Sequence, residues 1–170
     1  MPIKKRLALI VILLAVCVGC DQTTKTAAQS YLPSTGAWSY LGDTVRLQLT
    51  HNSGAFLSLG DSLPASWRYA LFSIGGSVLL LGLLGYALFS KRLTPVGVVA
   101  IALFFAGGAS NLADRWMHDG YVVDFINLGL GPVRTGIFNI ADMFIMAGAV
   151  VLLVSEFHQA KFLTLFSKRK

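Results

Sequence analysis

The chain has 170 residues, of which 55% are hydrophobic and only 13% are charged, and its formal net charge is +6. Soluble domains carry about 25% charged residues, so this composition excludes an ordinary soluble globular protein and indicates an integral membrane protein. The positive charge does not indicate a nucleic-acid partner, because the basic residues form no groove interleaved with aromatic side chains.

The basic residues are concentrated in three short segments. Nine of the fourteen lie there, with Glu156 as the only acid among them: Lys4, Lys5, Arg6, Lys91, Arg92, Lys161, Lys168, Arg169 and Lys170. The other five share the rest of the chain with seven aspartates. This asymmetry follows the positive-inside rule, with anionic membrane lipid as the partner of the basic residues. It predicts that both termini and the 90–95 loop are cytoplasmic and that every aspartate lies toward the outer side.

Four hydrophobic segments alternate with these basic clusters. Each approaches the roughly 20 residues that cross a hydrocarbon core. We therefore predict one integral membrane domain over residues 1–170, an all-α membrane fold with four transmembrane helices and a small extracytoplasmic β-sheet cradle. The helices are expected at about 5–27, 68–90, 95–114 and 137–156.

The N-terminal segment carries two features that favour other functions. Its basic start, apolar stretch and Cys20 are similar to a lipoprotein signal peptide, but three further spans follow, so we expect an uncleaved first helix. Cys17 and Cys20 form a C-x-x-C pair, as in four-helix membrane disulfide oxidoreductases. Such enzymes need a second cysteine pair, and the chain has only two cysteines. This oxidoreductase is the alternative function.

Strand patterns lie in the two segments expected on the outer side. Residues 37–56 contain Trp38–Leu41 and Val45–Thr50 around a Gly42-Asp43 turn, and the second run alternates apolar and polar residues. They predict a small antiparallel sheet on the outer leaflet, with Trp38 and Tyr40 at the interface. A further strand is expected at 121–126, carrying Asp124. Gly129, Gly131 and Pro132 are expected to break the chain before the fourth helix.

Two aspartates lie in apolar surroundings. Asp142 lies inside the fourth hydrophobic segment, where a carboxylate costs about 2.5–3.5 kcal/mol at the bilayer centre and is seldom kept without a use. It follows Gly136 by six residues, or about 9 Å of helix, so its position is shallow. Two neighbouring carboxylates cannot both ionise freely, so one can act as a base while the other acts as an acid. Asp124 and Asp142 are therefore the predicted catalytic dyad.

Other polar residues are expected to gather around these two acids. Asn111 and Arg115 share one helix face with Gly108, and Asp21 can pair with Lys25. Asn139 precedes Asp142 by three residues, so we expect its side-chain amide to reach the Asp142 carboxylate across one turn. More ordinary interpretations remain open. Arg115 could be an interfacial anchor, the asparagines could hold helices together, and Asp114 could be an exposed charge.

Metal-dependent and serine chemistry have no complete residue set. His51, His118 and His158 lie outside the four hydrophobic segments and no H-E-x-x-H motif is present, so no metal site is predicted. Ser110 has no histidine on another span to serve as its base.

Five motifs, in order along the chain, resemble those of the bacterial lipoprotein signal peptidases (signal peptidase II). They are the D-x-x-x-K of Asp21–Lys25, the N-x-G of Asn52–Gly54, the G-N-x-x-D-R region of Gly107–Arg115, the Val122–Phe125 block with Asp124, and the Phe138–Asp142 block with Asn139. The resemblance covers essentially the whole chain. Phe56 departs from the pattern, since many members have a second alanine there.

The resemblance implies an intramembrane aspartyl endopeptidase that cuts diacylglyceryl-modified prolipoproteins just before the lipidated cysteine. Asp124 and Asp142 would be catalytic. Asn52, Gly54, Asn111, Arg115 and Asn139 would bind substrate or hold the dyad, with Asp21, Lys25, Gly108 and Asp114 supporting them. The resemblance implies no cofactor and no metal. We expect a monomer in the bacterial cytoplasmic (inner) membrane, surrounded by lipid, with its active site on the outer, periplasmic face.

Overall fold

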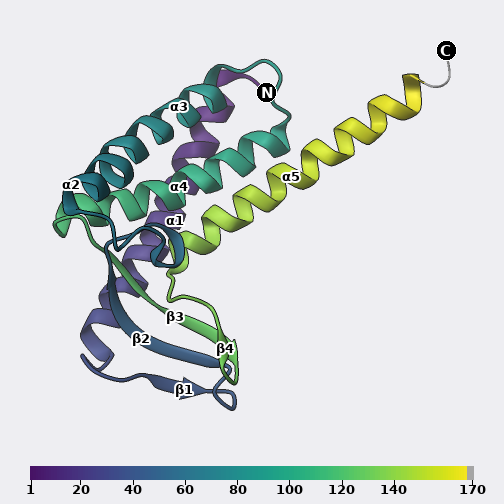
Figure 1. Cartoon of the computed structure of the whole chain (residues 1–170). Helices are drawn as coiled ribbons and strands as arrows, with labels where there is room; N and C mark the ends of the chain where they lie inside the picture. The colour runs from purple at the N-terminus through teal and green to yellow at the C-terminus, as the bar shows by residue number, and fades with distance from the viewer. Residues whose placement is uncertain (168–170) are drawn as a thin grey trace.

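Four long helical segments and one small sheet make up the fold (Figure 1). The structure, a computed structural model, describes the backbone of residues 1–167 and the side chains of residues 1–155 and 157. The segments are α1 (Ile3–Tyr31), the continuous run of α2 (Ala65–Arg68), the π-helix η2 (Tyr69–Gly75) and α3 (Gly76–Phe89), then α4 (Pro95–Met117) and α5 (Ile140–Ser167). The side chains of His158, Lys161, Lys168, Arg169 and Lys170 lie outside the described residues.

Helix α4 is the centre of the bundle, because α1, α3 and α5 all pack against it. Its contact with α5 is close where glycines replace side chains. A Cβ on Gly107 would lie 2.4 Å from the backbone oxygen of Ala141, and one on Gly148 would lie 2.5 Å from that of Ala100. Small residues of this kind let helix backbones approach in a membrane, where apolar burial does not drive association. The start of α5 is therefore held firmly against α4.

The N-terminus and the 90–95 loop lie at the same end of the bundle (Figure 1). The guanidinium of Arg6, on α1, donates to the backbone oxygens of Ala87 at 2.9 Å and Ser90 at 2.7 Å. It thereby satisfies carbonyl groups left unpaired where α3 ends. Two of the three basic segments of the sequence therefore meet here, at the end of the bundle away from the sheet.

The sheet is antiparallel, and its strands lie in sequence order: β1 (Trp38–Tyr40), β2 (Val45–Asn52), β3 (Val122–Leu130) and β4 (Val133–Arg134). The expected turn between β1 and β2 is present, with Leu41, Gly42 and Asp43 all at positive φ. Beyond it, β2 pairs with β3 at the end of the bundle away from the N-terminus (Figure 1). The sheet therefore connects the two segments that sequence analysis placed on the outer side.

The structure corrects several expected boundaries. Helix α1 runs from Ile3 to Tyr31, beyond the expected 5–27 at both ends, and α4 continues to Met117. Helix α5 begins at Ile140 rather than residue 137 and continues to Ser167. The predicted chain break at Gly129 was wrong. Strand β3 continues through Gly129 to Leu130, and Gly131, with a φ of 56°, makes a hairpin to β4.

Burial in this chain is the reverse of that in a soluble protein. Many large apolar side chains on the helices are exposed, and many buried side chains are polar or charged. By length and composition, two helical segments can cross a membrane, Ala65–Phe89 and Pro95–Met117, and residues 140–155 of α5 form a shorter apolar helix. The fold is thus a membrane helical bundle with a polar interior at one end.

Candidate active site

Asp124 and Asp142 come from different elements and lie buried where the sheet meets the bundle. Asp124 is on β3 and is 1% exposed, and Asp142 is in the first turn of α5 and is 5% exposed. Phe138 holds the two elements together, because its N–H donates to the Ile126 oxygen at 2.9 Å and its own oxygen accepts from the Ile126 N–H at 2.8 Å. Pairing of the backbone just before α5 with β3 therefore brings the two carboxylates into one site.

Each oxygen of the two carboxylates accepts one amide hydrogen bond. Asp124 accepts from the Nδ2 atoms of Asn139 at 2.6 Å and Asn52 at 2.8 Å. Asp142 accepts from Asn111 Nδ2 at 2.9 Å and from the backbone N–H of Asn139 at 3.1 Å. Within the described residues, no cation forms an ion pair with either carboxylate. All the donors to the two carboxylates are thus neutral. They orient both acids without the strong preference for the ionised form that a cation would impose.

Asn139 links the two acids and also caps α5. Its Oδ1 accepts from the Asp142 N–H at 2.9 Å, while Asp142 accepts in return from the Asn139 backbone N–H. This reciprocal pair is a capping box. Because Oδ1 is used by the cap, Nδ2 points toward Asp124 and Asn111. The expectation that the Asn139 amide contacts the Asp142 carboxylate was therefore wrong: the backbone makes that contact.

Asn52 lies beside Asp124 because of the strand register. Thr50 pairs with Asp124, so Asn52 lies two residues further along the same face of β2. The Asn52 side chain also accepts from the Gly54 N–H at 2.9 Å and donates to the Ala55 oxygen at 3.0 Å. Gly54 is required sterically, since a Cβ there would lie 2.7 Å from the Leu59 backbone oxygen. The 52–56 loop therefore closes over the site in one defined shape.

A buried cluster of charged residues holds the side chain of Asn111. Lys25, 2% exposed, donates to Asn111 Oδ1 at 2.9 Å and forms ion pairs with Asp21 at 2.7 Å and Asp114 at 2.8 Å. Since Asn111 Oδ1 accepts from Lys25 and Asn139, its Nδ2 must face Asp142. The cluster thus fixes the orientation of the Asn111 amide.

The two acids of the ion cluster also connect distant elements. Asp21 accepts from the Ala141 N–H at 2.8 Å, and Asp114 accepts from the Val123 N–H at 3.1 Å. Asp114 is fully buried, so the interpretation of Asp114 as an ordinary exposed charge is wrong. Gln22, which donates to Asp114 at 2.7 Å, was not predicted as a site residue. Its place inside the Asp21–Lys25 motif was the only available signal.

The environment of Asp124 favours its neutral form. Burial and the nearby Asp142 carboxylate raise the pKa of Asp124 from 3.8 to about 7, although the donors Asn52 and Asn139 act in the opposite direction. A carboxylic acid that keeps its proton close to neutral pH can serve as a general acid.

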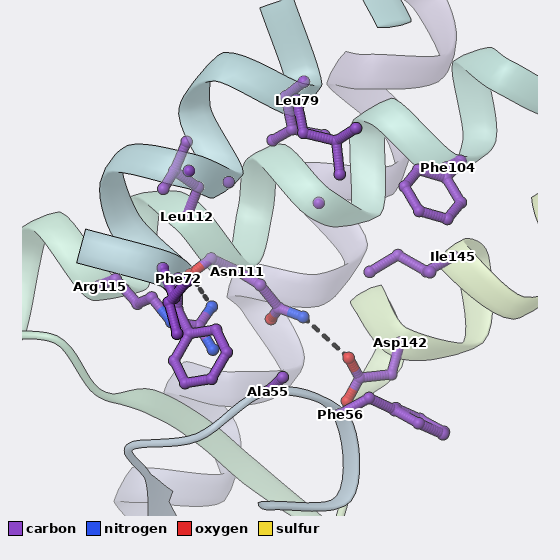
Figure 2. Close-up of a pocket in the computed structure, with 15 residues that line it drawn as sticks. Ala55, Phe56, Phe72, Leu79, Phe104, Asn111, Leu112, Arg115, Asp142 and Ile145 are labelled. Carbon is purple, nitrogen blue, oxygen red and sulfur yellow. Dashed lines mark hydrogen bonds between the residues drawn. The ribbon is translucent and has the colours of Figure 1, made fainter. Parts of the chain in front are cut away.

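A cavity of about 400 Å³ opens beside Asp142 (Figure 2). Its polar lining consists of Asp142, Asn111 and Arg115, and its remaining lining is apolar or glycine, including Gly108. Arg115 donates to the Gly54 oxygen at 2.5 Å and lies 5.8 Å from the centre of the Phe72 ring. The structure therefore ties Arg115 to the loop over the site, which a snorkelling anchor does not require.

The remaining candidate chemistries receive no support from the geometry. Within the described residues, no cluster of three or more His, Cys, Asp or Glu side chains could hold a metal ion. Cys17 is buried, Cys20 is exposed, and neither forms a disulfide.

Fold and site together define a class of protein, a helical membrane protein with two buried carboxylates that accept hydrogen bonds from amides, one of which lines a largely apolar cavity. The family model described as "Signal peptidase (SPase) II" matches residues 13–158. The chain therefore belongs to the lipoprotein signal peptidase family.

Individual relatives agree with this assignment. The lipoprotein signal peptidase of Mycobacterium avium (strain 104) is 31% identical, over 98% of this chain and 88% of the relative. That of Treponema denticola is 34% identical, over 89% of this chain and 90% of the relative. A solved bacterial membrane enzyme superposes with a TM-score of 0.76 over 89% of this chain and 88% of its own, at 24% identity, and supports the fold.

Proposed function

We propose that this protein is an aspartyl endopeptidase that removes signal peptides from prolipoproteins, cutting just before a diacylglyceryl-modified cysteine. Family membership supports the peptidase activity and favours it over the disulfide oxidoreductase alternative. The observation that carries the catalytic assignment is the bridge formed by Asn139 between the buried carboxylates of Asp124 and Asp142.

The proposed reaction uses the two acids in opposite protonation states. Asp142, which lines the cavity, takes a proton from water, and the water oxygen attacks the scissile carbonyl carbon. Asp124 donates its proton to the carbonyl oxygen. Asp142 then protonates the cysteine nitrogen while one hydroxyl proton of the tetrahedral intermediate returns to Asp124. The C–N bond breaks, leaving a carboxylic acid on the signal peptide and a free amine on the cysteine.

The other site residues position these groups. Asn52, Asn111 and Asn139 orient the carboxylates, and Lys25 with Asp21 and Asp114 holds Asn111. Arg115, half-buried at the polar end of the cavity, is placed to bind a carbonyl oxygen of the substrate, with Gly54 and Gly108 leaving space beside it.

We further propose that all four long helical segments cross the bacterial inner membrane. Apolar side chains exposed on α1, on α3 and on α5 support this, because lipid would cover them: Leu7, Val11, Ile12, Val16, Val78, Leu81, Met143, Met146 and Val150. Arg6 and the 90–95 loop would be cytoplasmic, and the dyad would lie at the outer face. The half-exposed Trp38 and Tyr40 fit a sheet resting on the outer leaflet.

The test is a cleavage assay with the purified full chain and one prolipoprotein prepared with and without its diacylglyceryl group. We expect cleavage just before the cysteine, at a rate about 100-fold or more higher for the lipidated form. A second preparation carrying Asp142→Asn is the matched control and should cleave neither. Equal rates on the two substrates would contradict lipid-dependent recognition.

A further inference from the structure

The cavity beside Asp142 continues away from the dyad as an apolar groove. Helix α4 forms its floor and packs against both α3 and α5, which form its walls. In Figure 2, Phe104 and Ile145 lie on the opposite side of the cavity from Arg115 and Phe72. Leu79, on the α3 wall, is 57% exposed although it lines the cavity, so the groove is open toward lipid.

The length of the groove matches one leaflet of a bilayer. On α4, its lining runs from Arg115 at the polar end to Phe104 at the apolar end. These eleven positions correspond to about 16 Å of helix. Half of a hydrocarbon core of about 30 Å is close to the same length. A ligand that fills the groove would therefore run from the dyad to the middle of the membrane.

Two consecutive glycines keep the groove open where η2 passes into α3. Gly75 and Gly76 both line it. A Cβ on Gly76 would meet no atom within 4 Å, and one on Gly75 would meet only the Ala70 oxygen, at 3.4 Å. Helix packing therefore does not explain glycine at position 76, unlike Gly107 on α4. A side chain there would occupy the groove without disturbing the helices.

The lining decides between a peptide and an alkyl chain as the occupant. The apolar end consists of Gly75, Gly76, Leu79, Phe104 and Ile145, whose side chains cannot pair with backbone N–H or C=O groups. Unpaired backbone groups are very costly at membrane depth, so an extended peptide does not fit. A helix about 10 Å across would fill 400 Å³ within roughly one turn. An alkyl chain needs no polar partner and follows the whole groove.

We propose that this groove binds one acyl chain of the substrate's diacylglyceryl group, and that Gly76 determines how long a chain it accepts. The inference rests on the proposed function. It assigns to the protein, rather than to bulk lipid, a part of the recognition of the lipidated cysteine.

The test compares two prolipoproteins that differ only in acyl length, one with two 16-carbon chains and one with two 4-carbon chains. The Gly76→Leu variant fills the groove, and Gly82→Leu is its matched control. Gly82 is also in α3 and its Cβ would also meet no atom within 4 Å, but it lies outside the groove. We expect Gly76→Leu to lower kcat/KM for the long-chain substrate about 10-fold or more relative to the short-chain substrate. Gly82→Leu should keep the unmodified ratio. An unchanged ratio for Gly76→Leu would overturn the proposal.

A binding measurement separates this inference from the proposed function. The long-chain substrate, with a photoreactive diazirine at the end of one acyl chain, is bound to the Asp124→Asn protein and irradiated. Cross-links should map to Leu79, Phe104 or Ile145 and be lost in Gly76→Leu. Cross-links only to the outer faces of the helices would overturn the groove assignment. Failure of the unmodified protein to cleave either lipidated substrate would contradict the proposed function, while the cross-links would still report on the groove.

Discussion

At the scale of single residues, the site holds two acids with amides rather than with cations. A cation paired to either carboxylate would favour its ionised form, whereas the amide donors orient both acids without adding a positive charge. The Lys25 ammonium group instead pairs with Asp21 and Asp114, and hydrogen bonds link it to Asp142 through Asn111. The ion cluster can therefore lie next to the proposed acid–base pair without forming an ion pair with either of its carboxylates.

Replacing either acid should remove activity. Asp124→Asn and Asp142→Asn keep the side-chain shape but can neither take nor supply the catalytic proton. We expect each to lower turnover by about 10²–10⁴-fold, and the double variant to be scarcely worse, because the two act as one unit. The measurement is single-turnover cleavage of the lipidated substrate.

The control for these variants is an aspartate whose side chain is exposed and lies outside the site. Asp119→Asn changes an exposed aspartate outside the site and should remain active. Asp114 is unsuitable, because it pairs with Lys25 inside the bundle. At Asp124, an asparagine leaves one of two facing amide donors unpaired, at a cost of about 1–3 kcal/mol. Thermal unfolding should accordingly accompany each assay, and high activity in either folded variant would exclude the aspartyl mechanism.

The protonation of Asp124 predicts that stability and activity both fall as pH rises through about 7. Because its pKa is raised from 3.8 to about 7, the folded chain binds more protons than the unfolded chain between these values. The Asp124 contribution to the free energy of unfolding is therefore fully present below about pH 4 and is lost as pH rises through 7. Asp124→Asn should flatten this dependence in unfolding measurements at pH 5 and pH 8.

Activity should fall over the same range. The cleavage rate is expected to decline as pH rises above about 7, since Asp124 then loses the proton it donates. The whole profile should be bell-shaped, with two apparent pKa values that belong to the pair. A rate that keeps rising to pH 9 would contradict the assignment of Asp124 as the acid.

At the scale of elements, the start of α5 shows what the sequence could and could not predict. The apolar pattern predicted the helix but placed its start at residue 137, because Ile137 and Phe138 are as apolar as the helix itself. The capping box and the pairing of Phe138 with Ile126 decide the true start at Ile140. The π-helix Tyr69–Gly75 was not predicted either, since a wider turn leaves no periodic signal in so short a run.

Asn139 offers a test that separates helix capping from dyad support. Serine keeps an oxygen that can accept from the Asp142 N–H but lacks the Nδ2 donor to Asp124 and Asn111. As N-caps, serine and asparagine differ little, so the change of cap in Asn139→Ser should alter the free energy of unfolding by no more than about 0.5 kcal/mol, not counting the lost Nδ2 hydrogen bonds. Cleavage should nevertheless fall at least about 10-fold. Asn139→Ala, without a cap, should lose a further ~1 kcal/mol. Near-normal cleavage by Asn139→Ser would show that its side chain serves only the helix.

At the scale of the whole molecule, the sequence predicted which residues gather but not how they connect. Positive-inside asymmetry and helix faces predicted that the polar ends of three helices converge, and the motifs indicated Asp21, Asn52, Asn111 and Asn139. The contacts themselves depend on tertiary pairing. Asp21 on α1 holds the Ala141 N–H on α5, 120 positions away, and no local pattern encodes that distance.

The orientation of the molecule in the membrane gives the last prediction. Arg6 binds the carbonyl groups at the end of α3, so the N-terminal cluster and the 90–95 loop must lie on one side, opposite the sheet. The three basic segments contain nine basic residues and one acid, and this excess predicts that their side of the membrane is the cytoplasmic side. Alkaline phosphatase folds actively only outside the cytoplasm, so fusions after Asp61 or Gly120 should be active and fusions after Arg92 or Lys170 inactive. Replacing Lys91 and Arg92 with glutamine should weaken this contrast, whereas replacing Arg46 and Arg134, on the sheet, should not. The reverse pattern of activity would place the dyad at the cytoplasmic face and exclude an outer-face peptidase.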